Sequence, residues 1–342
     1  MLSDLVSVKN HKYENGVGSF ETYSKSCINF TTQKTLESIV IPNGVTNINK
    51  DAFRICSELT SITIPSSVKN IEEYAFHSCD GLKEVHINDI AAWCSIGFYD
   101  SFANPLYYAH NLYLNGELVT DLVIPNGVTK IKRYAFYGCS GLTSVKIPNS
   151  VTSIEDYAFC DCTELKIVYN YSNLTFTKGS SSHGYVAYYA YAVADANDGS
   201  YIEEDGDFVW VVSDSSNVLA LCRNKDLEEV NLQSDYKGQN YEIGDSAFID
   251  CTKLTKIAIP NKVTSIGNNA FDKNSIKELY IEDGDTALSI GLFDNSDAFF
   301  YQSSLETLYL GRNLNYDYTY ALFHSSDMLK KVTIGNKVTT IR

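Results

Sequence analysis

The chain has 342 residues, with 27 Lys and Arg against 42 Asp and Glu, and a formal net charge of -15. Its hydrophobic fraction of 44% is ordinary for a folded protein and excludes a globally disordered chain. The negative charge repels phosphate backbones and anionic lipid, and no run of 18 apolar residues occurs, so we expect no nucleic-acid partner and no membrane insertion.

The first 35 residues do not follow the pattern that begins after them. They include Gly16, Gly18 and a polar run around Thr31, and we expect residues 1–35 to form an N-terminal cap. The segment after Met1 lacks the basic start and the apolar stretch of a signal peptide. We therefore expect either an intracellular protein or an export signal that lies outside this sequence.

A unit of 23 residues then recurs through most of the chain. Its clearest copies begin at Leu36, Leu59, Val119, Leu142 and Leu254, and the unit reads L-x-x-[IV]-x-I-P-x-x-V-x-x-I-x-x-x-A-F-x-x-C-x-x. Self-similarity at a fixed period is typical of a solenoid, in which each unit buries its apolar side chains by stacking on its neighbours. Such proteins mostly offer surfaces, so the repeat favours a binding function over catalysis.

Each unit begins with the alternating apolar pattern of a short strand. In the first copy Ile39 and Ile41 are expected to point inward, and Pro42 ends the strand because it has no backbone N–H. Phe53 is expected to fill the middle of the coil. Stacked first strands then form a parallel sheet on the concave side of a curved superhelix, and the convex side is irregular. The fold class is therefore a mainly β repeat solenoid.

Five of the nine cysteines occupy the same position of the unit: Cys56, Cys79, Cys139, Cys162 and Cys251. Equivalent side chains in stacked coils run parallel and keep a spacing of ~4.8 Å. A disulfide needs converging side chains whose Cβ atoms are ~3.8 Å apart. We therefore predict a ladder of free, buried thiols in place of the disulfide framework that nine cysteines first suggest.

Between Leu82 and Val119 the period fails, because these two starts are 37 residues apart in place of 23. We predict an insertion at about 88–118. It is expected to contain a short, capped helix that runs through Trp93 and a hairpin that turns at Asn115-Gly116.

A longer interruption covers residues 170–226. Tyr185–Val193 and Phe208–Val212 are interpreted as strands of an inserted β-meander. The run Asp195–Gly199 between them is interpreted as a hairpin turn. A calcium site is the alternative, because the run and the carboxylates that follow it partly resemble a calcium-binding loop.

The interruption separates two blocks of repeats, 36–169 and 227–342. The last copy begins at Leu329 and reaches Arg342 before its Ala-Phe and Cys positions, so the second block is expected to be truncated. A solenoid that ends in the middle of a unit exposes apolar core. We therefore expect the natural protein to continue past Arg342.

No pattern in the sequence indicates catalysis. The six histidines form neither an H-E-x-x-H motif nor another close ligand pair, and there is no G-x-S-x-G turn or phosphate-binding glycine loop. We therefore predict that the protein is not an enzyme and that it uses no cofactor and no metal.

The outward positions of the first strands are the candidate binding surface. Seven Lys and seven Asp or Glu fall on them, so this face is near neutral, and it is rich in hydroxyl and tyrosine side chains. Such a face suits a protein or glycan partner better than an ionic one, and an ordinary solvated sheet face is the alternative. The candidate ligand-binding residues are His86, Lys146, Tyr169, Asn231, Tyr280 and Tyr309.

The unit from Leu59 through Ala75-Phe76 to Cys79 resembles the BspA-like leucine-rich repeat, the treponemal-type class with a 23-residue period. The resemblance covers about residues 36–164 and 227–342. It implies a secreted or surface-attached bacterial protein with no catalytic residues. It also implies adhesion to host matrix proteins, to host cells or to other bacterial surface proteins. A glycan-binding module and a structural spacer that displays another domain are the alternatives.

Overall fold

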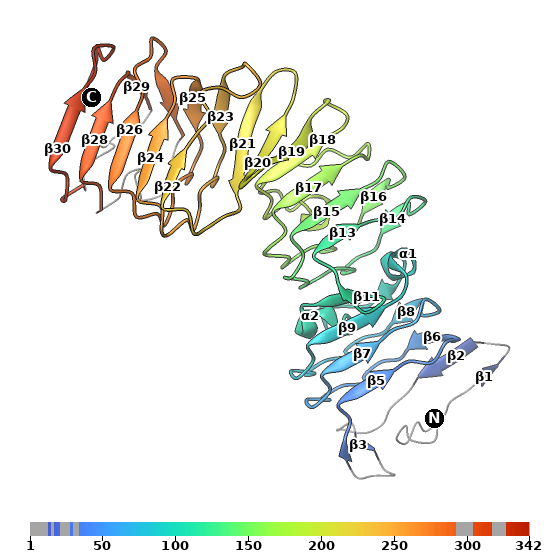
Figure 1. Ribbon diagram of the computed structural model, residues 1–342. Coiled ribbons are helices and arrows are strands. Elements are labelled where there is room, and N and C mark those ends of the chain that lie inside the picture. Colours follow the sequence, from blue (N-terminus) through green and yellow to red (C-terminus); the bar gives the residue numbers. More distant parts are fainter. Residues whose placement is uncertain are drawn as a thin grey trace. The chain divides into compact units, whose positions relative to one another are not determined.

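The computed structural model describes residues 13–14, 17–20, 28–29, 34–291, 304–316 and 326–341. Its contacts divide the chain into two compact units, Met1–Asn197 and Asp198–Arg342. Both units consist of short strands joined by turns, and the few helices of the described residues lie in the unit Met1–Asn197 (Figure 1). The prediction of a mainly β repeat solenoid is confirmed. Most of the predicted cap, residues 1–35, lies outside the described part.

In the unit Met1–Asn197 the first strand of each coil pairs with the first strand of the next. These strands make two sheets, with the orders β12-β11-β9-β7-β5 and β13-β15-β17-β18. All their pairings are parallel except that of the hairpin β11–β12. The first sheet comprises β5 (Ser38–Val40), β7 (Ser61–Thr63), β9 (Glu84–Ile87), β11 (Leu112–Leu114) and β12 (Glu117–Leu118). The second comprises β13 (Asp121–Val123), β15 (Ser144–Ile147), β17 (Ile167–Asn170) and β18 (Ala192–Asp195).

The second strands of the same coils form the other side of this unit. One sheet has the order β1-β2-β6-β8-β10, from β1 (Tyr13–Glu14), β2 (Val17–Phe20), β6 (Val45–Ile48), β8 (Asn70–Ile71) and β10 (Gly97–Phe98). Before the first unit, β3 (Ile28–Asn29) and β4 (Lys34–Thr35) form a separate antiparallel pair. Among the second strands, a smaller sheet pairs β14 (Lys130–Ile131) with β16 (Ser153–Ile154). These strands are short because only two residues in each copy, such as Val45 and Ile48, point into the core.

The unit Asp198–Arg342 repeats this arrangement. Its first strands form a parallel sheet of order β22-β24-β26-β28-β30, from β22 (Glu229–Asn231), β24 (Lys256–Ile259), β26 (Glu278–Ile281), β28 (Thr307–Leu310) and β30 (Lys331–Ile334). The other sheet has the order β19-β20-β21-β23-β25-β27-β29. It comprises β19 (Tyr201–Asp205), β20 (Phe208–Val212), β21 (Asn217–Cys222), β23 (Tyr241–Ile243), β25 (Val263–Ile266), β27 (Leu288–Ile290) and β29 (Leu314–Asn315).

In the described coils the phenylalanine of the Ala-Phe pair is buried in the middle of its coil, as predicted, whereas Ala298-Phe299 lies outside the described residues. Phe53 stacks on Phe76 with ring centroids 5.3 Å apart, and Phe136 stacks on Phe159 at 5.1 Å. All four rings are almost completely buried. Phe248 and Phe271 stack in the same way at 5.1 Å. The period of 23 residues therefore places the rings of consecutive, uninterrupted coils against each other in pairs.

The cysteine ladder is confirmed at four of its five positions, because Cys79, Cys139, Cys162 and Cys251 are free and buried. The thiol of Cys79 donates a hydrogen bond of 3.0 Å to the carbonyl oxygen of Phe53, one coil earlier. At Cys56 the prediction is wrong, because this residue is disulfide-bonded. The spacing argument excludes bridges between equivalent positions of stacked coils, and it does not restrict a cysteine that lies elsewhere in the chain.

The predicted helix and hairpin in the segment 88–118 are both present. Helix α1 (Ile90–Cys94) is capped by Asp89, which accepts a hydrogen bond of 3.0 Å from the backbone N–H of Ala92. In the hairpin of β11 and β12, Asn115 and Gly116 have φ angles of 53° and 92°, as a tight turn between antiparallel strands requires. The segment also contains the 3-10 helix η1 (Ser101–Ala103) and helix α2 (Leu106–Ala109).

The interpretation of Tyr185–Val193 as a strand is wrong. A 3-10 helix, η2 (His183–Tyr185), and turns occupy most of it, and β18 begins only at Ala192. Gly184 and Tyr185 have φ angles of 65° and 69°, which interrupt an extended chain. By contrast, β19, β20 and β21 form an antiparallel meander, and β21 joins β23 in the larger sheet of its unit. The division of the chain into cap, repeats and insertion stays a prediction.

In the described residues no helix is both long and apolar enough to cross a bilayer.

Candidate functional site

The outward side chains of the first strands form the candidate binding surface, which we call the sheet face. Alternate residues of a strand point to opposite sides, so Val145 and Ile147 of β15 are buried and Lys146 is exposed. The fifth residues of neighbouring units lie in register, and together with Tyr113 and Ala194 from the two interruptions they form three rows. The rows are Val40–Thr63–His86–Tyr113, Val123–Lys146–Tyr169–Ala194 and Asn231–Ala258–Tyr280–Tyr309–Thr333. All six predicted site residues lie on these rows.

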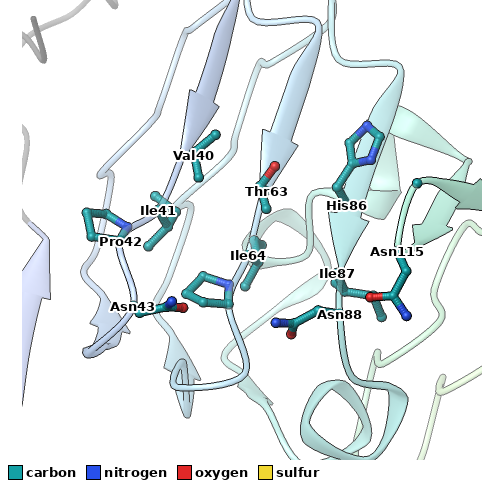
Figure 2. A pocket seen from close by; sticks show the side chains of 12 residues that line it. Val40, Ile41, Pro42, Asn43, Thr63, Ile64, His86, Ile87, Asn88 and Asn115 are labelled. Carbon is teal, nitrogen blue, oxygen red and sulfur yellow. The ribbon is translucent and has the colours of Figure 1, made fainter. Parts of the chain in front are cut away.

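The first row borders an open hollow of about 460 Å³, whose lining side chains are drawn in Figure 2. Val40, Thr63 and His86 line it from three neighbouring strands, and Asn115 and Gly116 of the hairpin turn line it from another side. Val40 is 65% exposed, so the hollow has an apolar rim. Its volume lies within the range of ~300–1,000 Å³ that is usual for small-ligand pockets.

His86 has two partners on the sheet face. Its ring stacks on Tyr113, with centroids 4.7 Å apart and an angle of 23° between the ring planes. Its Nε2 atom lies 3.0 Å from Oε2 of Glu84. The sequence did not identify Tyr113 as a site residue, because Tyr113 belongs to the segment where the period fails. The alternation Leu112-Tyr113-Leu114 was the signal that could have identified it.

Lys146 and Tyr169 are brought together by the pairing of β15 with β17. The Lys146 Nζ atom lies 5.0 Å from the centroid of the Tyr169 ring. A cation–π contact of this kind is worth ~0.5–1 kcal/mol at an exposed site. Val123 continues the row on the other side of Lys146 and is 56% exposed. The second row therefore offers apolar, cationic and aromatic groups on adjacent strands.

Tyr280 and Tyr309 form the tightest pair of the third row. Their ring centroids are 4.4 Å apart and the ring planes differ by 15°. The Tyr309 hydroxyl donates to both carboxylate oxygens of Asp283, at 3.1 and 3.0 Å, and this hydrogen bond raises the pKa of Tyr309. Tyr280 remains 44% exposed. Asn231 is not part of this pair, because Ala258 lies between Asn231 and Tyr280 in the row.

Much of the charge in the third sheet is balanced within the face. Lys256 lies 3.1 Å from Glu229, and Lys330 lies 2.7 Å from Glu306. The hydrogen bond and charge of Lys330 lower the pKa of Glu306, and the hydrogen bond to Glu229 raises the pKa of Lys256. These pairs leave little unbalanced charge at their positions on the third sheet.

The run Asp195–Gly199 is not a hairpin turn, because β18 pairs with β17 and β19 pairs with β20. The carboxylate of Asp195 accepts hydrogen bonds from the backbone and side-chain nitrogens of Asn197, at 2.9 and 2.7 Å, and from Asn170 at 3.0 Å. Across the described residues there is no group of three or more His, Cys, Asp or Glu that could hold a metal ion.

Comparison with known proteins assigns the chain to a family. The family model of the BspA type leucine rich repeat region matches residues 22–104, 109–183 and 220–342, in six copies. A search of the curated proteins found no match.

Several solved structures are similar to the chain. A leucine rich cell surface protein from Faecalibacterium prausnitzii A2-165 is 19% identical, with 96% of this chain and 92% of that chain covered and a TM-score of 0.45. A leucine-rich repeat protein from Bacteroides ovatus ATCC 8483 is 19% identical, with 96% and 87% covered and a TM-score of 0.38. The pneumococcal vaccine antigen PcpA is 18% identical, with 95% and 78% covered and a TM-score of 0.38. Because the family model matches far more than half of its residues, the chain belongs to the BspA type leucine-rich repeat family.

Proposed function

We propose that the chain is the non-enzymatic binding module of a secreted or surface-attached bacterial protein, and that it adheres to a protein of the host or of another bacterium. The family supports a protein-interaction repeat module. The observation that carries the proposal is the stacked pair Tyr280–Tyr309, held in register on two neighbouring strands of the sheet face. The surface or secreted location is proposed because the family resemblance implies it.

Tyrosine pairs of this kind are suited to protein contact. A tyrosine ring offers a large contact area at a low cost in conformational entropy, and tyrosine is enriched at interfaces and among their energetically dominant residues. Tyr280 is already oriented by its stacking on Tyr309, which is itself bonded to Asp283. A partner would therefore meet a preorganised aromatic surface.

The same reasoning extends to the other two rows. His86 with Tyr113, and Lys146 with Tyr169, are also pairs of polar and aromatic side chains on adjacent strands. We propose His86, Lys146, Tyr169, Asn231, Tyr280 and Tyr309 as contact residues for the partner. The hollow beside His86 gives that row room for a side chain of the partner.

The test uses the immobilised full chain and a panel of purified host matrix proteins and bacterial surface proteins, with a glycan array measured in parallel. We expect biolayer interferometry to detect binding to at least one protein of the panel. We expect the double variant Tyr280→Ala/Tyr309→Ala to lose this binding. Tyr171→Ala is the matched control, because Tyr171 is 51% exposed and lies on none of the rows. Binding to glycans alone would assign a glycan-binding function, and equal binding by all variants would remove the sheet face from the proposal.

A further inference from the structure

The parallel sheet of the unit Met1–Asn197 is interrupted between β12 and β13. β12 pairs only with β11, and β13 pairs only with β15. Within residues 34–291, which the structure describes throughout, each of these two strands therefore has one edge without a strand partner. Such an edge is a template for pairing with another chain, and natural proteins usually cover or blunt it.

The free edge of β13 is formed by the backbone of Asp121 and Val123. Thr120 accepts a hydrogen bond from β15 at 3.2 Å, and Ile124 donates one to β15 at 3.1 Å. Successive residues of a strand direct their N–H and C=O groups to opposite edges. The backbone groups of Asp121 and Val123 therefore point away from β15, into the interruption.

The free edge of β12 is formed by Leu118. Val119 donates to the carbonyl of Leu112 at 2.8 Å, and the two-residue turn pairs Leu114 with Glu117. In an antiparallel pair, bonded and non-bonded positions alternate. Leu118 lies at the non-bonded position, so its N–H and C=O also point away from β11.

A hollow of about 380 Å³ is lined by Ile90, Leu114 and residues 117–123, which include both edges. Its volume is within the range of ~300–1,000 Å³ found for ligand pockets. Leu118 is 43% exposed and Val123 is 56% exposed. Both side chains lie on the sheet face, because Leu118 pairs with Tyr113 and Val123 pairs with Lys146.

Two carboxylates give the hollow a negative charge. Glu117 and Asp121 line it and are exposed. Asp121 accepts a hydrogen bond of 2.6 Å from the hydroxyl of Ser144. In the described part of the chain neither carboxylate forms an ion pair. A complementary ligand is therefore basic as well as apolar.

We propose that the interruption between β12 and β13 binds an extended peptide segment of a partner protein as an added strand. Backbone pairing with Asp121 and Val123 supplies the binding, as in other cases of strand addition. Asp121 and Val123 point to the same side of the strand, so ligand lysines on that side place their ammonium groups near Asp121 and their methylene chains beside Val123 and Leu118. The valines between these lysines point to the opposite side. This inference shares only Val123 with the three rows, and it uses none of the six proposed contact residues.

The test is a titration of the full chain into the fluorescein-labelled peptide Lys-Val-Lys-Val-Lys, followed by fluorescence anisotropy. Saturable binding is expected. The same peptide with N-methylated valines keeps its charge and its side chains but loses two backbone donors, and we expect it to bind at least ~10-fold more weakly. Saturable binding of both peptides with equal affinity, or of neither, would overturn the proposal.

Two protein variants locate the site. Val123→Pro removes the backbone N–H that faces the interruption and keeps the bonds to β15, since proline is tolerated at a strand edge whose N–H is free. Asp121→Lys cancels the negative charge of the hollow, because the new ammonium group offsets Glu117. Its control is Asp156→Lys, at an exposed carboxylate that does not line the hollow. We expect ~10-fold weaker binding for the first two and no change for the control.

The variants are checked by circular dichroism, and the N-methylated peptide keeps the test decisive if Val123→Pro fails to fold.

A second copy of the chain is the competing occupant of the edge. Analytical ultracentrifugation tests this alternative. If the unmodified protein sediments as a dimer and the variants Asp121→Lys or Val123→Pro sediment as monomers, the edge serves self-pairing and the peptide proposal is overturned.

Discussion

The indole nitrogen of Trp93 donates a hydrogen bond of 2.7 Å to the backbone carbonyl of Ala135, which lies 42 residues further along the chain. Asn104, from the same insertion, donates to this carbonyl at 3.2 Å and to that of Tyr134 at 2.6 Å. Trp93 and Asn104 are almost completely buried. The insertion at about 88–118 is therefore packed into the core of the coil that follows it.

The first prediction concerns this bond. Trp93→Phe keeps an aromatic ring but removes the donor, and we expect a loss of about 1 kcal/mol in the free energy of unfolding. Trp93→Ala also leaves a cavity, and we expect a loss of ~3–5 kcal/mol. Urea unfolding monitored by circular dichroism measures both, with Tyr99→Ala as an exposed control. A Trp93→Phe variant as stable as the parent would show that the bond contributes nothing.

The second prediction concerns Gly138, which has a φ angle of 73°. A Cβ atom there would lie 3.2 Å from the carbonyl oxygen of Leu106 and 3.3 Å from the Cα of Tyr107, because helix α2 passes over this turn. Asp250, at the corresponding place in another coil, has a φ angle of 60° and carries a side chain. We expect Gly138→Ala to cost ~1–3 kcal/mol and Asp250→Ala to cost little. Equal melting temperatures for the two variants would contradict the explanation.

The third prediction is a loss of stability at alkaline pH. Burial raises the pKa of the thiols of Cys79, Cys94 and Cys139 from 9.0 to about 12. The unfolded chain releases these protons near pH 9 and the folded chain keeps them, so their effect is absent below about pH 9 and stability falls as the pH rises toward about 12.

Each of these thiols lowers the free energy of unfolding by roughly 1.4 kcal/mol per pH unit in that window. Urea unfolding at about pH 8 and about pH 10 measures the decline. Cys139→Ala should show a smaller decline than the parent, whatever its stability at the lower pH. If the free energy of unfolding of Cys139→Ala fell by as much as that of the parent between these two pH values, the assignment of the decline to buried thiols would be contradicted.

The fourth prediction concerns Arg312, a fully buried cation. Its guanidinium donates hydrogen bonds to the carbonyl oxygens of Pro260 at 2.9 Å and Asn261 at 3.0 Å, and burial lowers its pKa. Arg312→Met would leave both carbonyls without this donor, and we expect a cost of ~2–4 kcal/mol. Arg223→Ala, which removes an exposed ion pair with Glu204, should cost less than ~1 kcal/mol. A cost for Arg312→Met as small as that of the control would refute this role.

The repeated part of the fold could be predicted because each unit carries its own local signal. Pro42 ends a strand, Phe53 fills a coil, and the period then places Phe76 on Phe53 without further information. The same period predicts that the six site residues point outward. It also implies that residues at equivalent positions of adjacent units, such as Lys146 and Tyr169, are neighbours. Neither result needs knowledge of distant contacts.

The remaining features depend on which strands pair across the interruptions, and the 23-residue period does not encode this pairing. The stacking of Tyr113 on His86 and the free edge of β13 both follow from the way the hairpin β11–β12 replaces the next coil in the sheet. In the segment 185–193, Val186, Ala187 and Ala190 are buried without forming a strand, so an apolar pattern produced the wrong element. The disulfide bond of Cys56 was also not predictable from the repeat, because the spacing argument compares only equivalent positions of stacked coils.

The most direct test of the proposed sheet-face function is photo-crosslinking. Benzoyl-phenylalanine is introduced in place of Tyr280, and in a second protein in place of Tyr171, and each protein is irradiated on host cells. The account predicts covalent adducts with a partner protein from position 280 and few or none from position 171. Adducts from position 171 with none from position 280 would contradict it.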